Sequence, residues 1–97
     1  MTVVRHVVFR GRVQGVGFRA HVEDVAARTL VGGWVRNRRD GAVEAVFAGD
    51  AKIVDDTIAG ARRGSSAARV DSVDIRDGRD DELALRGNDT FAVLPTV

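Results

Sequence analysis

The sequence predicts an α+β fold in which two helices pack on one face of an antiparallel β-sheet. The chain has 97 residues, a length that suits one compact domain over residues 1–97. Segments rich in β-branched residues alternate with segments of helical periodicity in the order strand, helix, strand, strand, helix, strand, and a short strand-like segment follows. The pair Asp40-Gly41, between the second and third strand segments, favours a tight hairpin. Two βαβ units joined by a hairpin predict a ferredoxin-like two-layer sandwich (βαββαβ) whose second sheet face is open to water.

The first half of the chain predicts a strand, a helix and a second strand. Residues Val3–Arg10 are mostly β-branched or aromatic, and their alternation places His6 on the exposed face of the sheet. A helix is expected after a glycine-rich loop, because residues suited to one packing face recur there at three- and four-residue steps: Phe18, Val22, Val25, Ala26 and Thr29. Gly32-Gly33 is expected to break this helix before a short strand over residues 34–37.

The second half predicts a return strand, a second helix and two further strands. Asp50 is a suitable N-cap for a helix over residues 51–63, although Gly60 inside it lowers helix propensity. Val73 and Ile75 are expected to face the helices from the fourth strand. The remaining segments are strands over residues 43–47, 69–76 and 90–94 and a polar loop over residues 77–89.

Composition and charge exclude several functional classes. The chain has no cysteine, so disulfides, thiolate catalysis and cysteine-ligated metal sites are excluded. Fifteen basic and fourteen acidic residues give a net charge of +1, which argues against a nucleic-acid binder. The N-terminus lacks the pattern of a secretion signal, and no apolar stretch approaches the ~20 residues that cross a bilayer. We therefore expect a cytoplasmic protein that does not bind membranes.

The segment "GRVQGVGFR", Gly11–Arg19, joins the first strand to the first helix and predicts an anion site. Glycines allow successive backbone N–H groups to turn inward, and the N-terminus of a helix favours negative charge. Arg19, in the first helical turn, adds a planar set of donors that matches phosphate oxygens. The alternative is a tight strand-to-helix turn that carries a surface arginine.

The chain resembles the acylphosphatase family over nearly its whole length. The segments that carry this resemblance are "GRVQGVGFR", "GWVRN", "DGAVEAVFAG", "GARRG", "ARVDSVDI" and "FAV", and Asn37 lies eighteen positions after Arg19. The resemblance implies the ferredoxin-like sandwich. It also implies an enzyme that hydrolyses the carboxyl–phosphate anhydride of small-molecule acyl phosphates, without metal or cofactor.

The resemblance also implies which residues do the chemistry. Arg19 would bind the substrate phosphate together with five backbone amides, those of Gln14, Gly15, Val16, Gly17 and Phe18. Asn37 would hold the attacking water through its side-chain amide, which offers both a donor and an acceptor. Because an acyl phosphate carries a good leaving group, the enzyme supplies placement and charge stabilisation, and a phosphate oxygen of the substrate would take the proton of the water.

One departure and three alternatives accompany this interpretation. The family usually ends its first helix with Leu-Gly-Leu, whereas this chain has Thr29-Leu30-Val31, so a residue suited to a left-handed helix cap is missing. A non-catalytic domain of the same family, or one that handles carbamoyl phosphate, would retain the same residues. An RNA-binding module on the same fold is the third alternative, because "GVGFR" resembles a glycine-aromatic RNA-binding motif. We expect a monomer, because no long apolar surface stripe is left over.

Overall fold

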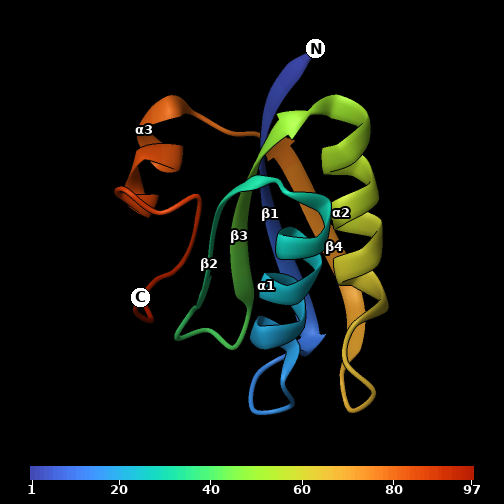
Figure 1. The fold of residues 1–97 in the computed structure, drawn as a ribbon. Helices are drawn as coiled ribbons and strands as arrows, with labels where there is room; N and C mark the ends of the chain where they lie inside the picture. Colours follow the sequence, from blue (N-terminus) through green and yellow to red (C-terminus); the bar gives the residue numbers. More distant parts are fainter.

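Two layers make up the computed structural model of the chain, which describes residues 1–97: a five-stranded sheet and two long helices on one of its faces (Figure 1). The elements in chain order are β1 (Thr2–Arg12), α1 (Phe18–Thr29), β2 (Gly32–Asn37), β3 (Val43–Asp50), α2 (Ala51–Arg63), β4 (Arg69–Asp77), α3 (Asp80–Leu83), the 3₁₀ turn η1 (Ala84–Arg86) and β5 (Phe91–Val93). The predicted ferredoxin-like sandwich is therefore confirmed. The predicted N-cap is also present, because the Asp50 carboxylate accepts a hydrogen bond from the Lys52 amide at 3.2 Å. None of the helices combines the length and the apolarity needed to cross a bilayer.

The sheet is mixed, whereas the sequence predicted an antiparallel one. Its strand order is β4-β1-β3-β2-β5, and every neighbouring pair is antiparallel except β2 and β5. After β4 the chain crosses the end of the sheet through α3 and η1 and then runs alongside β2 in the same direction (Figure 1). The sequence correctly predicted that a short C-terminal strand exists, but its direction depends on this crossing.

The main core lies between the sheet and the helices α1 and α2. Phe9 of β1 and Phe18 of α1 pack edge to face with ring centroids 5.2 Å apart, and both are fully buried. Ile75 lies on the same side of the sheet, opposite Val7, but it is 53% exposed. The sequence predicted that Ile75 faces the helices. Its exposure follows from the position of β4 at the edge of the sheet.

The opposite face of the sheet is partly covered, so the prediction that it lies open to water is wrong. Trp34, Val46 and Ala92 form a second buried cluster there, against which Leu83 of α3 packs. The Trp34 indole donates a hydrogen bond to the Glu82 carbonyl at 2.7 Å, which satisfies its buried N–H. Residues 77–89 therefore contain α3 and η1, and they do not form the loop that their polar composition predicted.

His6 also differs from its prediction, because it is buried on this second face. Its ring Nε2 lies 2.6 Å from Glu44 Oε2, and the guanidinium of Arg36 binds the other carboxylate oxygen at 2.7 Å. Burial raises the pKa of the Glu44 carboxyl, but the hydrogen bonds with His6 and Arg36 outweigh it, so this pKa lies below its usual value. Mutual pairing allows these polar side chains to be buried.

Helix α1 ends before the glycines that were expected to break it. Leu30 forms its cap in the left-handed conformation, with φ 63° and ψ 27°, and its side chain is 86% exposed. Gly32 and Gly33 belong to β2. Gly33 is required there because its φ is 136° and a Cβ would collide with the Val46 carbonyl of the neighbouring strand.

Candidate active site

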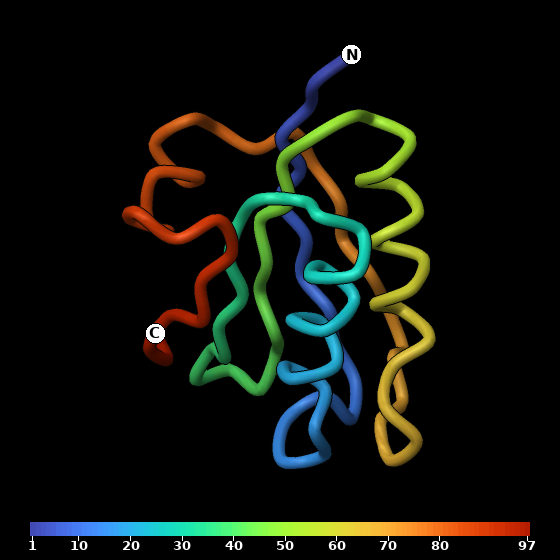
Figure 2. Tube along the Cα trace, in the orientation of Figure 1, coloured from blue at the N-terminus to red at the C-terminus, as the bar shows by residue number.

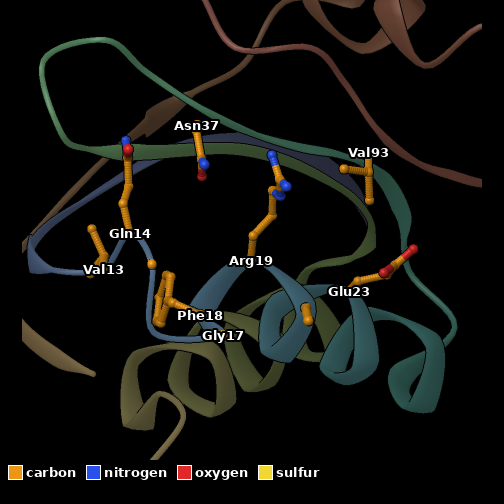
Figure 3. Close-up of a pocket in the computed structure, with 10 residues that line it drawn as sticks. Val13, Gln14, Gly17, Phe18, Arg19, Glu23, Asn37 and Val93 are labelled. Carbon is orange, nitrogen blue, oxygen red and sulfur yellow. The ribbon is translucent and has the colours of Figure 1, made fainter. Parts of the chain in front are cut away.

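A pocket of about 340 Å³ opens where the β1–α1 loop, the end of β2 and β5 meet (Figure 3). Its volume is within the range typical of small-molecule sites. The residues that line it are Val13, Gln14, Gly15, Gly17, Phe18, Arg19, Ala20, Glu23, Asn37 and Val93. The pocket thus brings together the glycine loop, Arg19 and Asn37, which are separated in the sequence.

Two glycines of the loop adopt a backbone conformation that other residues disfavour. Gly15 has φ 73° and Gly17 has φ 78°, both in the left-handed region. A Cβ at either position would meet no atom within 4 Å, so it is the conformation rather than the available space that requires glycine. Gly17 is the N-cap of α1 and supplies no side chain to its free amides.

The backbone N–H groups of residues 14–18 are free. None of them donates a hydrogen bond to another group of the protein. They surround the N-terminus of α1, where the helix dipole also favours negative charge. The loop therefore has the geometry that binds an anion.

Side-chain hydrogen bonds fix the loop in this conformation. Ser65 donates its hydroxyl hydrogen bond to the Val16 carbonyl at 2.6 Å, and Figure 2 shows the two loops involved side by side at one end of the molecule. The Gln14 side-chain amide donates to the carbonyls of Arg38 and Ala42 at 2.7 and 2.8 Å. These bonds tie the loop to the β2–β3 hairpin, whose first strand ends at Asn37, and so hold both sides of the pocket in register. The sequence indicated neither contact, since it assigned Gln14 a role only through its backbone amide.

Arg19 lies in the first turn of α1 and points into the pocket between Asn37 and Val93 (Figure 3). It is half-buried. The ion pairs on this side of the molecule join Arg10 and Arg38 to Asp40, at 3.5 and 3.0 Å, and none includes Arg19. Its guanidinium is therefore available to an anion held by the loop amides.

Asn37 is the last residue of β2, and its side chain points into the pocket from the side opposite the loop (Figure 3). Its Oδ1 is fully buried and has no hydrogen-bond partner, the only side-chain atom of the chain in that state. Its backbone is held by the sheet and by the Val97 amide, which donates to the Asn37 carbonyl at 3.2 Å. A buried acceptor without a partner loses hydration free energy, so its presence in a pocket points to a bound molecule.

The pocket also contains residues that the sequence did not predict as part of the site. Glu23 follows Arg19 by one helical turn, a spacing that could have placed it beside Arg19. Val93 could not have been found in this way, because β5 reaches the pocket only by pairing with β2. No group of three or more His, Asp and Glu side chains lies together in an arrangement that could hold a metal ion.

The fold and the pocket together define an α+β domain of the ferredoxin-like class with a loop of free amides at a helix N-terminus. The family model for acylphosphatase matches residues 5–92. An acylphosphatase of Rhodopseudomonas palustris strain BisB18 is 54% identical over 97 residues, covering 99% of this chain and 98% of the relative. The chain belongs to the acylphosphatase family.

Solved structures agree with this assignment. The crystal structure of acylphosphatase from Bacillus subtilis matches with a TM-score of 0.83 and 31% identity, covering 97% of this chain and 99% of that protein. HypF of T. kodakarensis also matches, with a TM-score of 0.75 and 27% identity, but the similar region is only 12% of that longer chain. The fold thus occurs both as a protein of this length and as a part of a larger one.

Proposed function

We propose that this acylphosphatase binds the phosphate of an acyl phosphate with Arg19 and the backbone amides of Gln14–Phe18, and that Asn37 positions the water that attacks it. The observation that carries the proposal is the convergence of three kinds of unsatisfied group in one pocket. These are the free amides, the unpaired Arg19 and the buried Asn37 Oδ1. The products are a carboxylate and inorganic phosphate.

The loop and Arg19 stabilise the phosphate in complementary ways. Backbone amides are fixed donors that need no reorganisation when charge develops on the phosphate oxygens. The guanidinium adds a full positive charge and can donate two parallel hydrogen bonds. Because the side chains of Gln14 and Ser65 already anchor the loop, little entropy is lost when the phosphate binds.

Asn37 acts on the water. Its side-chain amide, which offers both a donor and an acceptor, would hold the water so that a lone pair of the water oxygen points at phosphorus. The new bond forms between the water oxygen and phosphorus, and the bond from phosphorus to the acyl oxygen breaks, so that the carboxylate leaves with the electron pair. The proton of the water passes to a phosphate oxygen, and no protein base is needed.

The test is hydrolysis of benzoyl phosphate, followed by its ultraviolet absorbance without added metal. Arg19→Gln should lower kcat/KM by about 100-fold or more, the effect of removing a donor that stabilises developing charge. Asn37→Ala should lower kcat/KM by about 100-fold, because the attacking water is no longer held in position. Arg62→Gln is the matched control, because Arg62 is exposed on α2 and does not line the pocket. Native circular dichroism with full activity in either site variant would refute the assignment.

A second candidate keeps the same residues: a domain of this family that handles carbamoyl phosphate or is not catalytic. The match to a segment of the longer HypF shows that the fold also occurs as a part of larger proteins. Full-length similarity to proteins named acylphosphatase supports the enzyme instead. A folded wild type that hydrolyses neither benzoyl nor carbamoyl phosphate would support the non-catalytic alternative. Activity on carbamoyl phosphate alone would support the specialised one.

An RNA-binding role has little support, because Phe18, the aromatic residue of the loop motif, is 1% exposed and cannot stack on a base. A single domain over residues 1–97, a monomeric state and a cytoplasmic location stay predictions. Limited proteolysis, analytical ultracentrifugation and cell fractionation test them in that order.

A further inference from the structure

The pocket contains one carboxylate that the proposed mechanism does not use. Glu23 lies on α1 four residues after Arg19, and its side chain is exposed on the side of Arg19 that faces Val93 (Figure 3). Its neighbour Asp24 pairs with Arg28 at 3.1 Å, but Glu23 pairs with no basic group. Its negative charge therefore acts on whatever occupies this part of the pocket.

The position of the phosphate determines what that occupant is. If the amides at the start of α1 hold the phosphate, the rest of the substrate must lie elsewhere in the same pocket. Apart from Val13 on the loop side and Asn37, the lining residues that remain are Ala20, Glu23 and Val93. A helix rises 1.5 Å per residue, so Glu23 lies about 6 Å further along the helix axis than Arg19. That distance is comparable with the span from an acyl carbonyl carbon to the far end of a benzoyl ring.

We propose that Glu23 sets the charge preference for the acyl group: it disfavours acyl groups with a distal anion and favours those with a distal cation. The inference rests on the proposed function, because it uses the phosphate position assigned there. Val93, which is 43% exposed, offers an apolar contact to the body of the acyl group, and Glu23 acts on its far end.

The size of the effect follows from how open this part of the pocket is. Two unit charges about 6 Å apart change a rate constant about threefold at the dielectric constant of water, and more strongly where protein replaces water. Glu23 is exposed, so salt screens its charge in part. We therefore expect an effect of about three- to tenfold for each charged substrate.

The experiment compares three rigid substrates: benzoyl phosphate, 4-carboxybenzoyl phosphate and 4-(aminomethyl)benzoyl phosphate. In Glu23→Gln, kcat/KM for the carboxylated substrate divided by that for benzoyl phosphate should rise about three- to tenfold over wild type, and the same ratio for the aminomethyl substrate should fall. Both changes should shrink as salt is added. The ratio cancels the intrinsic reactivity of each substrate, since it is compared between two forms of the enzyme.

Asp24→Asn is the matched control, because it removes the same charge from the next position, outside the pocket. It should leave both ratios at their wild-type values. Ratios that stay constant in Glu23→Gln, or that change equally in Asp24→Asn, would overturn the inference about Glu23. The proposed function would still stand in that case, provided that wild type hydrolyses benzoyl phosphate. A wild type that hydrolyses none of the three substrates would overturn the proposed function and this inference with it.

Discussion

Replacing Leu30 by glycine should stabilise the protein. Leu30 is the only residue other than glycine with a positive φ, and it caps α1 at φ 63°. An L-residue in this conformation brings its Cβ too close to the following carbonyl oxygen, whereas glycine has no Cβ. The leucine side chain contributes little in return, because it is 86% exposed.

The expected gain can be worked out from these features. Relief of the left-handed strain contributes about 1–2 kcal/mol. The greater freedom of glycine in the unfolded chain removes about 0.4–1 kcal/mol of this. The free energy of unfolding should therefore rise by about 0.8 kcal/mol, which for a domain of this size raises Tm by about 3–6 °C.

Thermal and urea unfolding, followed by circular dichroism, measure this change. Leu30→Ala is the control, because it removes the exposed side chain but keeps the Cβ and therefore the strain. It should leave Tm nearly unchanged. If Leu30→Gly unfolds at the same temperature as Leu30→Ala, or at a lower one, the strain at this position is not what limits stability.

Two further predictions concern the second sheet face and the contact between the helices. The pKa of Glu82 is lowered to about 2, mainly by its hydrogen bonds with Arg76, so this pair stabilises the fold above about pH 4.5 and the stabilisation is lost as the pH falls toward 2. Glu82→Gln should lower the free energy of unfolding at pH 7, and the loss should be only about 1 kcal/mol because the pair is partly exposed. Urea titrations should show the difference between the two proteins disappearing near pH 2. A difference that is independent of pH would contradict the reasoning. Gly60→Ala should bring no gain despite the better helix propensity of alanine, because its Cβ would lie 3.0 Å from Val25 Cγ1 of the facing helix. In a Val25→Ala background the same change should stabilise by about 1 kcal/mol, and equal effects in both backgrounds would show that the contact does not matter.

The pocket shows what could be inferred about the site before the structure. Arg19 and the glycine loop are neighbours in the sequence, so their combination as an anion site could be predicted from local geometry. Asn37 was linked to them by the family resemblance, and the structure places it in the same pocket. Glu23 was not predicted, although its spacing from Arg19 could have indicated it. Val93 could not be predicted, because it reaches the pocket only through the pairing of β5 with β2.

For the fold too, features that depend on nearby residues could be predicted from the sequence, and features that depend on distant residues could not. The periodicity of residues 51–63 and the cap at Asp50 determined α2 correctly, because helix formation depends on residues a few positions apart. The burial of His6 was missed, because it depends on a residue 38 positions away. Glu44 forms a hydrogen bond with the His6 ring, and this bond offsets the loss of hydration when the ring is buried.

The sequence by itself thus determined the order and type of the main elements, the helix-facing core and the glycine-rich turn that leads into α1, because each of these follows from contacts within a few residues of the chain. Only the tertiary structure decided that residues 80–86 cover the second sheet face, that β5 runs parallel to β2, and that Val93 lines the pocket. Polar residues such as Glu82 were expected in solvent, yet the Glu82 backbone carbonyl accepts the hydrogen bond that the buried Trp34 indole N–H donates. Local periodicity does not indicate such long-range pairs, because each polar group alone forms hydrogen bonds with water, and only the fold brings the two groups together.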